Sequence, residues 1–152
     1  MSYGRLLLDT NLLLLLIVGS ASKDYISKHK RLKAYSEKDF DILMRIISYV
    51  PNVFVTPNIL TETSNLAGQI PEPARTKIFN AFRDYIPSVD EHYCESRRAT
   101  NREEFIRLGL TDAVILHEMT DAFILLTDDF DLYSAAIKEG YPAQNFNHLR
   151  DL

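Results

Sequence analysis

Two short apolar runs, RLLL at residues 5–8 and FILL at residues 123–126, are each followed by a turn that contains aspartate. Short, mostly apolar runs of this kind are typical of strands that are buried on both faces of a parallel sheet. Patterns typical of helices occupy much of the sequence between them, and strands that alternate with helices form parallel sheets covered by helices. The sequence therefore predicts one α/β domain over residues 1–152, a three-layer α/β/α sandwich with a central, mainly parallel sheet of four to five strands.

A leucine-rich segment at residues 11–18 follows the first run and favours a helix. A polar, basic connection at about residues 20–35 leads from it to an amphipathic segment at residues 36–50. Ser36 followed by Asp39 is a typical start for that second helix. Because the first helix is apolar on every side, we expect it either to be buried in the core or to pair with a second copy of the chain.

Capping residues and apolar periodicity predict the remaining elements. Thr56 and Pro57 form a typical helix start, and Thr111 is expected to cap a later helix. In chain order, the expected elements are a strand at 53–55, a helix at 57–67, a helix from the prolines at 71 and 73 to residue 85, two short helices within 91–108, a helix from 112 to about 121, a helix at 131–139 and an edge strand at 145–147.

The sequence argues against a secreted or membrane protein. Its single cysteine, Cys94, has no partner for an internal disulfide. The apolar run at residues 12–18 is far shorter than the roughly 20 residues that a membrane-spanning helix requires. The amino-terminal segment also lacks the basic start and the cleavage site of a secretory signal. We therefore expect a cytoplasmic protein with no membrane partner.

Four acidic residues are placed where regular elements would bring them together. Asp9 and Asp129 follow the two predicted strands, at the sheet edge where open α/β proteins bind ligands. Glu62 and Asp112 lie near the starts of predicted helices, where an acid alone is also commonly a favourable first-turn residue. Asp9 lies between two apolar segments, and a buried carboxylate without a partner is costly. Together the four acids predict a site for a divalent cation.

Four motifs contain these acids, and they occur in order along almost the whole chain. They are LLLDTN at 6–11, TPNILTE at 56–62, GLTDAVIL at 109–116 and LLTDDFDL at 125–132, followed by NFNHL at 145–149. This series resembles the PIN-domain nucleases, a family that includes the toxin ribonucleases of bacterial and archaeal toxin–antitoxin pairs. The connection at about 20–35 is longer and more basic than in the most compact toxin members, which leaves open whether the chain is a toxin or an RNA-processing enzyme.

The resemblance implies a catalytic centre in which four acids bind the metal: Asp9, Glu62, Asp112 and Asp129. Asp129 is the acid of a Thr-x-Asp motif that begins at Thr127, but Asp128 and Asp131 leave the identity of the fourth acid open. The implied support residues are Thr10, Asn11, Thr127 and Asp131, although Asn11 is equally suited to cap a helix.

The implied reaction is metal-dependent hydrolysis of single-stranded or structured RNA. One or two Mg²⁺ or Mn²⁺ ions would bind the scissile phosphate and lower the pKa of a coordinated water, which attacks without a side-chain nucleophile. The resemblance also implies products with 5′-phosphate and 3′-hydroxyl ends. An antitoxin protein and a second copy of the chain are further partners suggested by the family.

Basic residues are concentrated in two tracts, although the net charge of −4 gives no general attraction to nucleic acid. The candidates for RNA binding are Lys28, Lys30, Arg31 and Lys33 in the first tract and Arg97 and Arg98 in the second. A solvated loop and an exposed helix face, respectively, are the simpler interpretations of these tracts.

Other functions are less compatible with the sequence. A phosphoaspartate phosphatase generally needs a second aspartate two positions after Asp9, where this chain has Asn11. A dinucleotide-binding fold needs glycines in the turn after the first strand, and DTNLLL has none. The four histidines show no metal-ligand spacing. The main alternative is a catalytically inactive PIN-like module that binds RNA or another protein.

Overall fold

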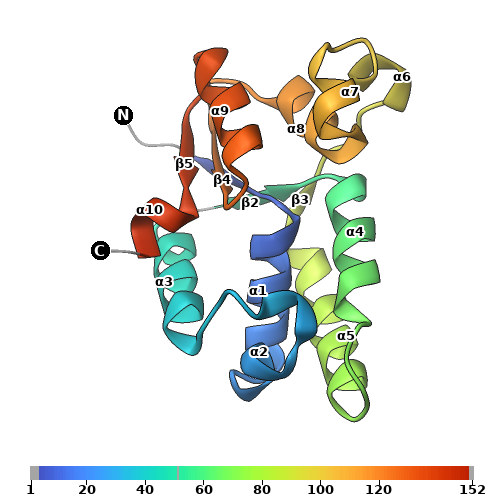
Figure 1. The fold of residues 1–152 in the computed structure, drawn as a ribbon, viewed down its shortest axis with the longest axis vertical. Coiled ribbons are helices and arrows are strands. Elements are labelled where there is room, and N and C mark those ends of the chain that lie inside the picture. Colours follow the sequence, from blue (N-terminus) through green and yellow to red (C-terminus); the bar gives the residue numbers. More distant parts are fainter. Residues whose placement is uncertain (1–3, 51, 151–152) are drawn as a thin grey trace.

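The computed structural model describes residues 4–50 and 52–150 and contains a five-stranded parallel sheet in the order β3-β2-β1-β4-β5. The strands are β1 (Arg5–Leu8), β2 (Asn52–Val55), β3 (Asp90–Glu91), β4 (Phe123–Thr127) and β5 (Ala143–Asn145). Helices cover both faces of this sheet (Figure 1). The prediction of an α/β/α sandwich with a parallel sheet is confirmed.

The helices connect the strands in the alternating pattern expected for parallel pairing. They are α1 (Thr10–Ala21), α2 (Asp24–Lys28), α3 (Glu37–Ser48), α4 (Pro57–Ala67), α5 (Ala74–Tyr85), α6 (Ser96–Ala99), α7 (Glu104–Leu108), α8 (Leu110–Glu118), α9 (Phe130–Lys138) and α10 (Phe146–Arg150). Two 3₁₀ turns, η1 (Lys30–Leu32) and η2 (Ile86–Ser88), lie after α2 and α5.

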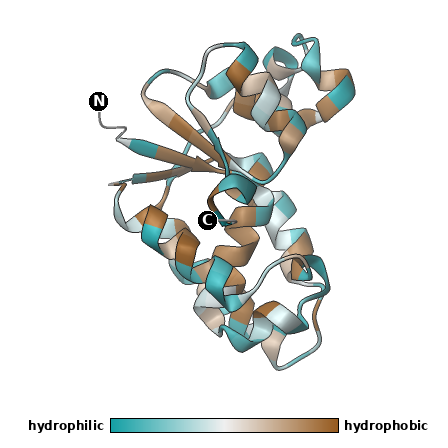
Figure 2. Ribbon diagram, turned by 60° about the vertical axis from the view of Figure 1, so that its left-hand side comes forward, coloured by the Kyte–Doolittle hydropathy of each residue, from teal (hydrophilic) through white to brown (hydrophobic). Residues whose placement is uncertain are grey.

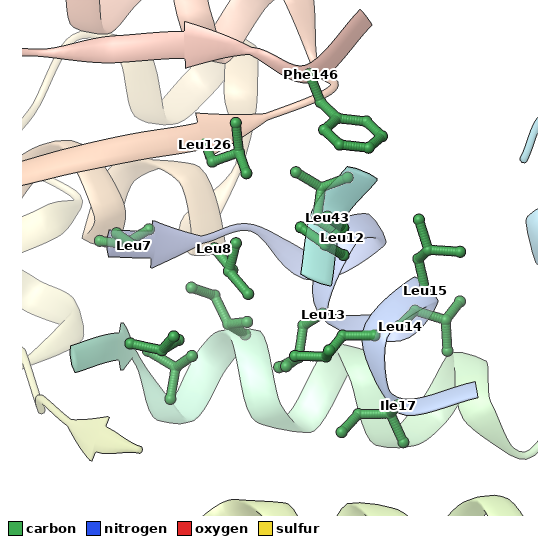
Figure 3. Close-up of a cluster of buried hydrophobic side chains, with 14 of the residues drawn as sticks. Leu7, Leu8, Leu12, Leu13, Leu14, Leu15, Ile17, Leu43, Leu126 and Phe146 are labelled. Atoms are coloured by element: carbon green, nitrogen blue, oxygen red, sulfur yellow. The ribbon is translucent and has the colours of Figure 1, made fainter. Parts of the chain in front are cut away.

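Helix α1 forms the centre of the core. Every residue from Leu12 to Gly19 is buried, and Figure 3 shows its leucines packed with side chains of β1, β4, α3 and α10. Each fully buried leucine of this kind contributes about 1.5–3 kcal/mol. Because a Cβ added at Gly19 would lie 2.2 Å from the Phe40 ring, α3 approaches α1 more closely than any other residue type would allow. The helix is therefore core, and its leucines are not exposed for pairing with a second copy.

The apolar stretches of the described residues are used for packing within the molecule. Figure 2 shows hydrophobic segments on the strands and on the helix faces that meet them. Although α1 is strongly apolar, it has only 12 residues. Within residues 4–50 and 52–150, no helix is both long enough and apolar enough to cross a membrane.

The predicted helix starts at Ser36 and Thr56 are confirmed. Ser36 and Asp39 form a reciprocal capping box: the Asp39 amide donates to the Ser36 hydroxyl and the Ser36 amide donates to the Asp39 carboxylate. The Thr56 hydroxyl accepts from the Ile59 amide at 3.2 Å, and Pro57 occupies the first turn of α4. Local sequence therefore set these two boundaries.

The predicted cap at Thr111 is wrong. Helix α8 begins at Leu110 and its N-cap is Gly109, whose φ of 88° lies in the region that glycine adopts readily. Thr111 therefore lies inside the first turn, where its hydroxyl is available for a contact with another helix. Local propensity did not distinguish the two positions because Gly and Thr are both acceptable N-caps.

Three other segments differ from the prediction. The last strand is residues 143–145 and not 145–147, because the chain enters α10 at Phe146. The connection at about 20–35 is partly helical, with α2 and η1 within it. Strand β3 was not predicted, since two residues are too few to show a periodic pattern.

The strand order makes the carboxyl ends of β1 and β4 the point where the connections of the sheet change direction. From β1 the chain adds β2 and then β3 on one side, and it later returns to add β4 and β5 on the other. Leu8 of β1 is in register with Leu126 of β4, so these two strands end side by side. Connections leave the strands in opposite directions at such a switch point, and ligands of open α/β sheets bind in the resulting crevice.

Candidate acidic site at the carboxyl edge of the sheet

A cavity of about 520 Å³ lies at the carboxyl ends of β1 and β4. It is lined by residues from the turns after both strands, from η1, from α4 and from the segment that joins α7 to α8. All four predicted acids are among its lining residues: Asp9, Glu62, Asp112 and Asp129. Thr10, Asn11 and Asp128 also line it, whereas Asp131 does not. None of the four histidines of the chain is a lining residue.

Asp9 is the most buried of the acids, with 6% of its surface exposed. It caps α1, where its carboxylate accepts from the Leu12 amide at 3.4 Å, and it also accepts from the Thr127 hydroxyl. Burial, together with the nearby charge of Asp128, raises the pKa of Asp9 to about 8, although both hydrogen bonds act in the opposite direction. The ionised form of Asp9 is therefore disfavoured in the folded protein.

Asp112 lies in the first turn of α8 and is half-buried. Burial, together with the charges of Asp129 and Glu62, raises the pKa of Asp112 to about 7. These two neighbours belong to different segments, the turn after β4 and helix α4. The structure thus brings three acids that are far apart in sequence within electrostatic reach of one another.

Glu62 is exposed on α4. Its carboxylate accepts a hydrogen bond from the Thr111 hydroxyl on α8. This contact joins the two helices on either side of the cavity. Sequence analysis assigned Thr111 a capping role, so the contact with Glu62 was missed.

The turn after β4 carries the remaining acids. Asp129 caps α9: its carboxylate accepts from the Asp131 amide at 2.8 Å and from the Leu132 amide at 3.2 Å. Asp128 instead accepts from the Asn11 amide at 3.2 and 3.3 Å. Both Asp128 and Asp129 face the cavity, and only Asp131 of the three candidates lies outside its lining.

Tyr35 is a residue of the site that sequence analysis did not identify. It is 9% exposed, and its hydroxyl donates to the Asp128 carboxylate. Burial and the adjacent negative charge raise the pKa of Tyr35, so its hydroxyl remains a donor at neutral pH. A single tyrosine at the end of a basic connection carries no local signal for this role, because the contact spans 93 positions in sequence.

The basic tracts are divided by the fold. Arg31 lines the cavity and, among residues 4–50 and 52–150, is the only cationic residue to do so. The three lysines of the same tract are exposed and are not among the lining residues: Lys28, Lys30 and Lys33. Arg97 and Arg98 lie on α6 outside the cavity, and Arg97 pairs with Glu95 at 2.7 Å.

The donor set is chemically suited to a hard divalent cation, since carboxylate and hydroxyl oxygens are the ligands that Mg²⁺ and Mn²⁺ prefer. Burial and neighbouring acids raise the pKa of Asp9 and of Asp112, and a bound cation would favour the ionised form of both. Within residues 4–50 and 52–150, however, no three acidic, histidine or cysteine side chains are arranged to hold one metal ion. Three of the carboxylates accept hydrogen bonds from hydroxyl groups of other elements.

Comparison with known proteins does not place the chain in a family. No protein-family model matches the sequence, and no curated protein matches it. The inference of a function therefore depends on the residues around the acidic cavity and on the motifs to which they belong.

Proposed function

We propose that the protein is a Mg²⁺- or Mn²⁺-dependent ribonuclease that hydrolyses phosphodiester bonds of single-stranded or structured RNA. The observation that carries the proposal is the convergence of acids from four separate segments on one cavity at the switch point of the sheet. The motifs that contain these acids resemble those of PIN-domain nucleases, which suggests the type of reaction.

Four acids of the cavity would hold the cation: Asp9, Glu62, Asp112 and Asp129. A bound divalent cation would supply an activated water and would neutralise charge on the scissile phosphate. The chain itself orients the carboxylates. The Thr127 hydroxyl donates to Asp9 and the Thr111 hydroxyl donates to Glu62, so each of these acids has a hydrogen-bond donor from another element.

Arg31 is proposed to contact an RNA phosphate at the entrance of the cavity. Arg31 is a cationic lining residue, and a guanidinium can donate two parallel hydrogen bonds to a phosphate. The Asn65 amide on α4 also lines the cavity and provides a neutral donor. RNA would therefore approach along η1 and α4.

The biological context is proposed from the motif resemblance alone. A toxin that is inhibited by an antitoxin protein and an RNA-processing enzyme are both compatible with the site, and a homodimer is a further possibility suggested by the family. Cys94 is a free, buried thiol, which suits a reducing cytoplasm.

The test is cleavage of an end-labelled, mixed-sequence single-stranded RNA in Mn²⁺, Mg²⁺ or EDTA. Wild type is compared with Asp9→Asn and Asp112→Asn, and Asp84→Asn is the control because Asp84 is exposed on α5 away from the cavity. We expect cleavage that requires the cation, is lost in both cavity variants and persists in the control. A folded wild-type protein that binds the cation but cleaves no RNA would favour the inactive binding module.

A further inference from the structure

We propose that Tyr35 is a positioning residue that, together with Asn11, orients the Asp128 carboxylate as a fifth acid of the cavity. The inference depends on the proposed function, because it assigns a role within the same acidic site. It adds Asp128 to the acids of the site, although Asp128 lies one position before the acid of the Thr-x-Asp motif.

The Asp128 carboxylate is held from two sides. The Tyr35 hydroxyl donates to one of its oxygens, and the Asn11 amide lies 3.2 and 3.3 Å from the two oxygens. The backbone at the same residue is also fixed, since the Asn147 side chain donates to the Asp128 carbonyl at 3.2 Å. These contacts come from three separate parts of the chain, so they define the direction in which the carboxylate points.

Tyr35 itself is held rigidly. Its ring packs against Phe146, with centroids 6.2 Å apart, and the Arg150 guanidinium lies 4.6 Å from its centre. The hydroxyl, which is the polar group of this side chain, donates to the Asp128 carboxylate. Because the ring is fixed by packing and the hydroxyl by Asp128, replacement by phenylalanine removes the orienting bond and retains the packing.

Arg150 connects this tyrosine to the start of α3. Its guanidinium donates to both carboxylate oxygens of Asp39, at 3.2 and 2.6 Å, and to the Ala34 carbonyl. Asp39 also belongs to the capping box of α3 and is 6% exposed. Figure 1 shows α10 next to α3, which is the arrangement that these bonds require. The carboxyl-terminal helix thereby fixes the segment that presents Tyr35.

The test measures binding of Mn²⁺ alone to RNA-free protein by isothermal titration calorimetry. The variants are Tyr35→Phe, Asp128→Asn and the double variant, with melting curves in EDTA to confirm folding. Tyr25→Phe is the matched control, because Tyr25 lies in the same connection but does not line the cavity or contact Asp128. Loss of a group that orients a metal ligand typically lowers affinity about 10- to 100-fold.

We expect Tyr35→Phe to bind Mn²⁺ roughly tenfold more weakly, Asp128→Asn to bind at least as weakly as Tyr35→Phe, and Tyr25→Phe to match the wild type. The double variant should bind no more weakly than Asp128→Asn, because both substitutions act through one carboxylate. Wild-type affinity in Tyr35→Phe, or losses that add in the double variant, would overturn the inference alone. A wild-type protein that does not bind Mn²⁺ would overturn the proposed function as well. If Asp128→Asn does not fold, the comparison of Tyr35→Phe with Tyr25→Phe decides the question.

Discussion

The two walls of the acidic cavity differ in how their carboxylates are held. The strand wall, formed by Asp9 and Asp128, follows β1 and β4, and both Asp9 and its hydroxyl donor Thr127 are buried. The helix wall, formed by Glu62 and Asp112, comes from α4 and α8 and is more open to solvent. The strand wall is fixed by the register of neighbouring strands, whereas the helix wall is joined across its two helices by the contact of Thr111 with Glu62.

This difference assigns a separate physical role to each wall. The register of the sheet places Asp9 where burial disfavours its ionised form. The cost of burying an ionised carboxylate therefore arises at the strand wall. Glu62 can adjust to a ligand at little cost because its carboxylate is solvated and is attached to the opposite helix by one hydrogen bond. The strand wall is therefore expected to define the position of a cation, and the helix wall is expected to adapt to it.

The largest expected effect is on the pH dependence of stability in EDTA. The folded-state pKa values of Asp9, about 8, and Asp112, about 7, lie above the unfolded value of about 3.9. Their contribution to stability is therefore fully present below about pH 4 and is lost as pH rises through 7 and 8. We expect the melting temperature to fall by on the order of 5–10 °C between pH 6 and pH 9.

Asp9→Asn should remove most of that decrease at the alkaline end, because an amide has no proton to lose. Asp84→Asn, at an exposed position on α5, should retain the wild-type slope. Differential scanning calorimetry across this pH range provides the measurement. Equal slopes of melting temperature against pH in wild type and Asp9→Asn would show that ionisation of the buried Asp9 does not cause the loss of stability at alkaline pH.

A smaller effect is expected from removing one hydroxyl on each wall. Thr127→Val leaves the buried Asp9 carboxyl without its hydroxyl donor and deprives the Asp129 amide of an acceptor at 2.9 Å. A buried polar group that loses its partner costs about 1–3 kcal/mol, which corresponds to a decrease in melting temperature of about 5 °C. Thr111→Val should lower it by about 1 °C or less, because Glu62 remains solvated.

Thermal unfolding of the two valine variants at pH 7 in EDTA measures this difference. Valine has nearly the shape of threonine, so packing is retained in both variants. Equal destabilisation would contradict the distinction between the walls, and a larger loss in Thr111→Val would reverse it.

The smallest expected effect concerns RNA at the rim of the cavity. The variants are made in the Asp9→Asn background, which prevents cleavage under the proposed function. Arg31→Ala should weaken RNA binding several-fold, and it should lower the steepness of the plot of log binding constant against log salt concentration by about one. Lys33→Ala should have less effect, because the Lys33 ammonium is outside the cavity lining and donates to the Ser27 carbonyl at 3.0 Å. Filter binding at several salt concentrations measures both. A larger loss in Lys33→Ala would show that RNA follows the exposed tract.

Much of the fold was predictable because its signals are local. The apolar runs of β1 and β4, the helical character of α1 and the caps at Ser36 and Thr56 all depend on neighbours a few positions away. The wrong cap at Thr111 lies two positions after Gly109, and both residues satisfy the same local rule for an N-cap. Tertiary packing then decides between them.

The candidate site was predictable in composition but not in its contacts. The convergence of the acids follows from the rule that parallel strands end at a common edge. The partners of Asp9 and Asp128, which are Thr127 and Tyr35, lie 118 and 93 positions away in sequence. No pattern of spacing encodes such pairs, since they depend on how segments pack after each has formed.

The sequence by itself determined the parallel α/β architecture and the set of acids at the carboxyl edge, because apolar periodicity predicts the strands and helices and the acids lie at their ends. Only the tertiary structure decided which wall is buried, that Asp128 faces the cavity while Asp131 does not, and that Arg31 alone of its basic tract lines it. The reason is physical. Burial and charge proximity are properties of packed segments, and these properties set the pKa of Asp9, while the hydrogen bonds from Asn11 and Tyr35 set the orientation of Asp128.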